Sequence, residues 1–188
     1  MVPPRRARPS SVVPFLEGPH VLLRPLTPGD VTPRYLRWIN DQLVVQHLET
    51  GFFPSTLRSL RQYVSDHATR KDCLFLAIID RRRGRHIGNV KLEPINWIHR
   101  TAILGIMVGD KRAWGKGLGT EAIRLVTHYA FRRLNLRKVS AEVRATNPGA
   151  LRAFRKAGFV IEGRRRAEIL VNGTPRDVFR LEKFPIVK

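Results

Sequence analysis

The stretch KRAWGKGLGTEA at 111–122 combines glycines and cations in a pattern that suits anion binding. Glycines recur at alternate positions from Gly115 to Gly119, and residues without a Cβ let a backbone approach a ligand closely. The stretch follows an apolar run and opens an amphipathic one, which places its N–H groups at a helix N-terminus, where anions are favoured. Arg112 and Lys116 add positive charge. The stretch therefore predicts a loop that binds a pyrophosphate.

Other features limit which chemistry this loop serves. Walker A loops end in Gly-Lys-Ser/Thr and dinucleotide fingerprints read G-x-G-x-x-G, and neither spacing occurs at 111–122. The chain of 188 residues has one cysteine, so it forms no intrachain disulfide or multi-cysteine zinc site, and we expect no metal. That residue, Cys73, opens the apolar run CLFLAII, which indicates a buried strand thiol rather than a nucleophile.

Two motifs together resemble the GCN5-related N-acetyltransferase (GNAT) superfamily. The segment from Arg112 to Gly117 stands where that family carries its Q/R-x-x-G-x-G/A acetyl-CoA loop, and ATNPGALRAFRKAGF at 145–159 is similar to its second signature. The similarity extends over Val21 to Glu182. It is closest to the branch of the ribosomal-protein N-terminal acetyltransferases, and GNVKLEPINWIHR is similar to members that acetylate sugar-linked amines.

The resemblance implies an acetyl-CoA-dependent N-acetyltransferase that transfers the acetyl group directly, and it implies site residues by position. The backbone of Ile106, Met107 and Val108 would pair with the pantetheine arm as an added strand. Asn147 would hydrogen-bond that arm, with Phe154 packed beside it. The implied phosphate contacts are Arg112, Ala113, Trp114, Gly115, Lys116, Gly117, Gly119, Thr120 and Lys156.

The proton-transfer groups are less well defined. Phe154 stands where many family members place a tyrosine as general acid, and the strand TAILGIMV before the loop has no carboxylate. An ammonium must still lose a proton before it attacks a thioester. Glu93 and His99, which flank the Asn96-Trp97 connection, are the candidate bases; a water relay or an acceptor that is already deprotonated would also suffice.

The acceptor stays open between a protein N-terminus and a small amine such as an amino sugar. The chain has 35 Lys+Arg against 15 Asp+Glu, a net charge of +20 spread over its last two thirds, which is compatible with an acidic or phosphate-bearing acceptor. The same charge suggests a second class, a nucleic-acid-binding module, although no helix-turn-helix, zinc finger or RNP pattern is present. A CoA-binding sensor without turnover is a third class, suggested by Phe154, and a homodimer is compatible with each.

The elements that position these residues follow from periodicity. Apolar runs at 73–80, 86–95 and 101–108 predict an antiparallel meander, and a helical pattern over 117–134 follows the loop. The class is therefore α/β, a single-domain, mostly antiparallel mixed sheet flanked by helices. The other expected elements are strands at 20–27, 138–143, 159–163, 167–171 and 176–182, and helices after Asp30, Thr56 and Asn147.

The domain limits and location are also predicted. The Pro/Arg-rich residues 1–18 are expected to be a flexible segment, and 19–188 the acetyltransferase domain. Prolines interrupt any apolar run near the N-terminus, and no stretch of about 20 apolar residues occurs. We therefore expect a cytoplasmic protein with no membrane partner.

Overall fold

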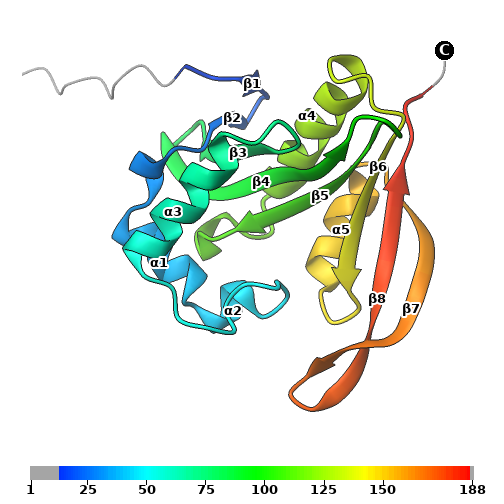
Figure 1. Ribbon diagram of the computed structural model, residues 1–188. Coiled ribbons are helices and arrows are strands. Elements are labelled where there is room, and N and C mark those ends of the chain that lie inside the picture. Colours follow the sequence, from blue (N-terminus) through cyan, green and yellow to red (C-terminus); the bar gives the residue numbers. More distant parts are fainter. Residues whose placement is uncertain (1–12, 187–188) are drawn as a thin grey trace, which may run out of the picture.

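One sheet of eight strands organises the fold in the computed structural model, which describes residues 13–186 (Figure 1). Its spatial order is β1-β2-β3-β4-β5-β6-β8-β7, and every neighbouring pair is antiparallel except β5–β6. This confirms the expected α/β class and the meander β3-β4-β5. The strands are β1 Leu16–Glu17, β2 Val21–Pro25, β3 Leu74–Asp80, β4 Arg85–Asn96, β5 Thr101–Val108, β6 Lys138–Arg144, β7 Val160–Val171 and β8 Thr174–Lys183.

Helices cover both faces of the sheet, because successive side chains of its strands point to opposite faces and are apolar on both. On β3, Leu76 and Ile78 pack with α4 and α5, whereas Ala77 and Ile79 pack with α1 to α3. Burial of both faces explains why this strand reads as a continuous apolar run. The helices are α1 Pro33–Ile39, α2 Gln42–Val45, α3 Leu57–Ala68, α4 Leu118–Arg132 and α5 Pro148–Lys156, with 3₁₀ turns η1 Pro28–Asp30 and η2 Lys111–Ala113.

The parallel pair β5–β6 is short. It consists of Thr101↔Lys138, Ala102↔Val139 and Ile103↔Ser140. Figure 1 shows the two strands starting side by side and then diverging. The last five residues of β5 therefore keep β4 on one side and have no strand on the other.

Two local expectations differ from the structure in detail, and one element was missed. Leu16 and Glu17, placed in the flexible segment, pair with β2, and Phe15 packs edge-on against Tyr129 with ring centroids 4.8 Å apart; residues 1–12 lie outside the described part of the chain. The two strands expected at 159–163 and 167–171 are one strand, β7, with register shifts that disguise its period. The short helix α2 was not expected.

No helix between residues 13 and 186 combines the length and hydropathy that a membrane crossing requires.

Candidate functional site

A cavity of about 680 Å³ opens where β5 and β6 separate. Its wall is built from the end of β5, the glycine-rich loop, the first turns of α4, the helix α5 and the segment 43–48. Most residues that the resemblance implied for acetyl-CoA lie on this wall, namely Ile106, Met107, Val108, Ala113, Trp114, Gly115, Gly117, Gly119, Thr120, Asn147 and Lys156. The structure thus gathers residues from three separate parts of the chain around one space.

The end of β5 presents an unpaired edge to this cavity. Its residues Ile106 to Val108 pair with β4 on one side only, since the pairing with β6 ends at Ile103. An edge of this kind offers backbone N–H and C=O groups to an extended ligand that carries amides. Gly88 permits the close β4–β5 approach, because a Cβ there would meet the Met107 carbonyl oxygen at 2.2 Å.

The glycine-rich loop has the backbone that an anion site needs. Gly115 and Gly117 adopt positive φ values of 72° and 78°, and Gly117 is the N-cap of α4. The first N–H groups of that helix have no partner within it. Asp110 Oδ1 accepts a hydrogen bond from the Arg112 N–H at 3.0 Å, and Trp114 Nε1 donates to the Val108 carbonyl at 2.7 Å. The loop is therefore held to the end of β5 with its helix N-terminus facing the cavity.

Glu121 fastens the start of α4 to the sheet from the other side. Its Oε1 accepts hydrogen bonds from the N–H groups of His20 at 2.8 Å and Val21 at 2.9 Å. Burial alone would raise the pKa of this carboxyl, but the two backbone donors and His20 lower it overall. The only acidic group in the first turn of α4 is thus committed to β2 and does not line the cavity.

The cations on the cavity wall differ from those expected. The side chain of Arg112 is 77% exposed, and neither it nor Lys116 lines the cavity. Arg124 and Arg152 line it together with the expected Lys156. Arg124 also donates to the Lys156 carbonyl at 2.5 Å. A helical-wheel reading could have found both arginines, since Arg124 lies two turns after Gly117, and Arg152 lies one turn before Lys156.

The second signature contributes one cavity residue and one core residue. Asn147 lines the cavity and caps α5 by accepting a hydrogen bond from the Ala150 N–H at 3.0 Å. Phe154 is only 3% exposed and packs edge-on against Phe159, with ring centroids 5.1 Å apart. It does not line the cavity, so the expected packing of Phe154 beside the cofactor is not supported.

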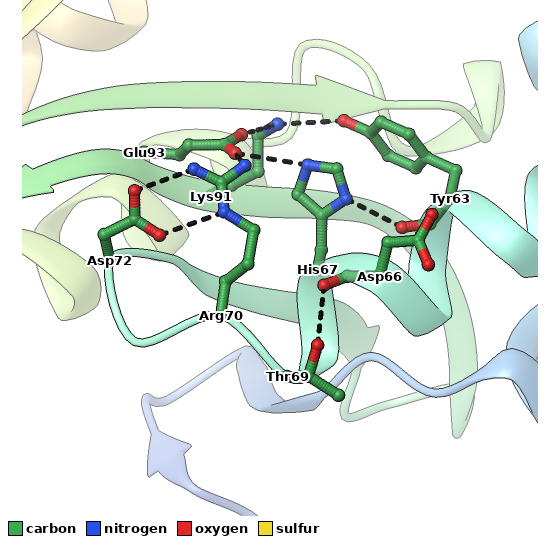
Figure 2. Close-up of polar contacts among 8 residues, drawn as sticks. All are labelled: Tyr63, Asp66, His67, Thr69, Arg70, Asp72, Lys91 and Glu93. Carbon is green, nitrogen blue, oxygen red and sulfur yellow. Dashed lines mark hydrogen bonds and ion pairs between the residues drawn. The ribbon is translucent and has the colours of Figure 1, made fainter.

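Glu93, the first candidate base, is bound within a polar cluster on α3 and β4 (Figure 2). Its carboxylate pairs with Lys91, Arg70 and His67, the last at 3.2 Å from His67 Nε2. Burial tends to raise the pKa of Glu93, but the ion pair with Lys91 and then the charges of His67 and Arg70 lower it overall. A carboxylate stabilised in this way is a weak base.

Neither candidate base lies on the cavity wall. Because β4 runs antiparallel to β5, Glu93 lies near Leu104 and the start of β5, not near Val108. His99 is exposed in the turn between those strands, where its N–H donates to Asn96 Oδ1 at 2.8 Å. The structure thus places Glu93 and His99 outside the cavity wall, and their role as bases stays a prediction.

A further histidine, which was not predicted as a site residue, lies on the wall. His47, after α2, lines the cavity, and its Nδ1 lies 3.3 Å from Thr146 Oγ1. Burial, and then the positive charge of Arg144, lower the pKa of this imidazole. Burial also raises the pKa of Cys73 to about 11, so this thiol stays protonated at neutral pH and is a poor acyl carrier.

A model of the acetyltransferase (GNAT) domain matches residues 20–160 of the chain. The chain belongs to the GNAT acetyltransferase family. It is accordingly an acyltransferase, an N-acetyltransferase that uses acetyl-CoA as cosubstrate and an amine as acceptor. The cavity fits this cosubstrate, with an open strand edge for the pantetheine amides and a helix N-terminus for the pyrophosphate.

Similar proteins include other N-acetyltransferases. A probable N-acetyltransferase YjcK of Bacillus subtilis is 32% identical over 87% of this GNAT chain and 93% of its own length. The spermidine N(1)-acetyltransferase of Vibrio cholerae is 32% identical over 85% and 90%. A crystal structure of the Vibrio cholerae spermidine N-acetyltransferase with CoA and spermine superposes with a TM-score of 0.79 at 28% identity, covering 88% of this chain and 95% of that one. These relatives are not specifically of the ribosomal-protein or amino-sugar branch.

Proposed function

We propose that this acetyltransferase acetylates a primary amine whose neighbouring groups are neutral or anionic, such as a protein N-terminus or an amino sugar. The observation that supports this acceptor is the charge of the cavity wall. Among residues 13–186, the wall includes Arg124, Arg152 and Lys156 and no Asp or Glu. Such a wall attracts phosphates and carboxylates and repels a second or third ammonium group on the acceptor.

The two carboxylates that flank the wall segment 43–48 are already paired. Asp41 forms an ion pair with Lys111 Nζ at 2.6 Å, and Glu49 forms one with Arg144 Nη2 at 2.8 Å. A polyamine carries several positive charges and needs free carboxylates along its binding site. The net charge of +20 adds a long-range repulsion of polycations. Spermidine, which gives the Vibrio cholerae relative its name, is therefore the less favoured acceptor for this chain.

The chain's own residues supply binding and orientation for a direct transfer. The edge of β5 at Ile106–Val108 would align the pantetheine arm, Asn147 would hydrogen-bond it, and the α4 N-terminus would hold the pyrophosphate. When acetyl-CoA is bound, it supplies an activated thioester carbonyl near the point where the strands diverge. A backbone N–H of β5 directed at that carbonyl oxygen would stabilise the negative charge that develops during attack.

An acceptor panel tests the proposal. CoA release would be followed with purified protein, acetyl-CoA and three acceptors at equal concentration: spermidine, a short peptide with a free N-terminus, and a nucleotide-linked amino sugar. We expect kcat/KM for the peptide or the sugar to exceed that for spermidine at least tenfold at low ionic strength. Added salt should narrow this gap, because screening weakens the repulsion of the polyamine.

Two results would contradict the proposal. A preference for spermidine over both other acceptors would show that the wall charge does not determine acceptor choice. CoA binding without release of CoA–SH from acetyl-CoA in the presence of any of the three acceptors would favour a sensor instead. A control reaction with Arg152→Gln should raise the relative rate with spermidine, since this variant removes one positive charge from the wall.

A further inference from the structure

We propose that His47 accepts the proton that the acceptor ammonium loses before it attacks the thioester. This role rests on the direct transfer to a primary amine proposed above. His47 lies on the cavity wall, whereas Glu93 and His99 do not. It is also the one histidine on that wall among residues 13–186.

The histidine is carried by a segment of the cavity wall that is fastened to the end of β6. The Arg144 guanidinium, at the end of β6, donates to the carbonyl oxygens of Gln46 and Leu48, each at 3.0 Å, and to Glu49 Oε1 at 2.8 Å. The Arg144 side chain is only 10% exposed. These contacts join residues nearly one hundred positions apart in sequence. They hold the backbone on both sides of His47, at Gln46 and Leu48, so the position of His47 is determined by the fold.

The ring orientation suits proton acceptance at Nε2. The Thr146 hydroxyl lies 3.3 Å from Nδ1. When Nδ1–H donates to that oxygen, the lone pair is on Nε2, since the hydrogen bond at one ring nitrogen determines the tautomer. Within the described part of the chain, no protein group hydrogen-bonds Nε2. The nitrogen is therefore able to accept a proton from a ligand in the cavity.

The surroundings keep this imidazole neutral near pH 7. Burial favours the neutral ring, and the positive charge of Arg144 on β6 acts in the same direction. Glu49 opposes both, but its side chain is 84% exposed and is paired with Arg144. Thr146, on the connection to α5, is uncharged. A base that is unprotonated at working pH is ready to take a proton.

The step balances in atoms and charge. Nε2 of His47 takes one proton from R–NH₃⁺, and the resulting R–NH₂ forms a C–N bond to the thioester carbon. The tetrahedral intermediate collapses with cleavage of the C–S bond, and the electron pair leaves on sulfur. The surplus proton on the new amide nitrogen goes to the thiolate, giving CoA–SH. The imidazolium then releases its proton to water.

The variant His47→Gln tests the proposal on whichever amine the wild-type protein acetylates fastest. We expect kcat at pH 7 to fall about 100-fold or more, within the range for loss of a general base. The affinity for CoA, measured by calorimetry, should change less than twofold. The rate of the variant should recover as pH rises toward the pKa of the free amine, because hydroxide and solvent then deprotonate the acceptor. The matched control is His128→Gln, an exposed histidine on α4.

A second measurement does not depend on activity. NMR titration of the imidazole signals, assigned by comparison with His47→Gln, should show His47 titrating below the ordinary histidine pKa of 6.5. Titration at or above 6.5, or a His47→Gln variant with wild-type kcat and pH profile, would overturn the role of His47. Failure of the acceptor proposal is a distinct outcome, since it would appear as a wild-type preference for spermidine whatever the effect of the histidine variant.

Discussion

The contact that fastens residues 46–49 to β6 gives a prediction whose size can be worked from the structure. The variant Arg144→Met keeps much of the apolar stem and removes the guanidinium. It therefore deletes hydrogen bonds to the Gln46 and Leu48 carbonyls and the ion pair with Glu49. Residues 46–49 would lose the guanidinium that binds them, while the hydrogen bonds within α2 and within the sheet stay in place.

The expected cost comes mainly from the two carbonyl contacts. Hydrogen bonds to a charged group contribute about 1.5–3 kcal/mol each, and partial exposure of these carbonyls places them near or below the lower end of that range. The Glu49 pair adds about 0–1 kcal/mol, because that carboxylate is exposed. A total of about 2–4 kcal/mol corresponds to a shift of about 30- to 1000-fold in the equilibrium between docked and undocked segment.

Hydrogen exchange and kinetics measure this shift. Amides of residues 46–49 should exchange faster in Arg144→Met by about the same factor, and kcat/KM for the acceptor should fall tenfold or more while CoA affinity is unchanged. The acidic limb of the pH profile should also move to higher pH, since a positive charge that lowers the pKa of His47 is gone. Arg164→Met is the matched control, because it removes an ion pair with Asp177 on the β7–β8 hairpin, outside the cavity wall. Unchanged exchange at 46–49 together with unchanged kcat/KM would refute the reasoning.

Two other predictions concern the start of α4. Gly117→Ala and Gly173→Ala should each lower the free energy of unfolding by about 1 kcal/mol, because both glycines have positive φ, 78° and 73°, with open space around them. Only Gly117→Ala should weaken CoA binding measured by calorimetry. Equal CoA affinities of the two variants would contradict the assignment of this helix N-terminus to the pyrophosphate. Glu121→Gln should destabilise the fold by about 1 kcal/mol at pH 7. Folding lowers the pKa of Glu121 below 4.5, so its stabilisation is present above that pH and is lost as pH falls through the pKa of the folded state. Urea unfolding should therefore show the difference in unfolding free energy between wild type and Glu121→Gln shrinking in acid. A difference that does not depend on pH would contradict this.

The sequence predicted those features that depend on local chemistry. The glycine loop, the apolar strands and the Asn172-Gly173 turn were readable because each reflects backbone dihedrals or burial over a few residues, and both turn residues do have positive φ. The cofactor residues followed from the family resemblance, and most of them line the cavity.

Features that depend on strand direction and long-range contacts were not readable. Glu93 was chosen for its nearness in sequence to the loop, but the antiparallel course of β4 places it near Leu104, away from the loop that follows Val108. His47 was missed because its surroundings come from Arg144 and Thr146, whose contacts with the segment 46–49 span 95 to 99 positions of the chain. No periodicity or motif records such a contact.

The short pairing between β5 and β6 has a mechanical consequence. Among residues 13–186, three residue pairs form the only strand pairing between β1–β5 and β6–β8. Within the sheet, these two sets of strands are therefore joined by one short contact. A cosubstrate that lies against β5 and also contacts α5 would connect the two sets of strands a second time. Acetyl-CoA should therefore slow amide exchange throughout β6. It should raise the unfolding temperature both by mass action and by restricting the motion of β6–β8 relative to β1–β5.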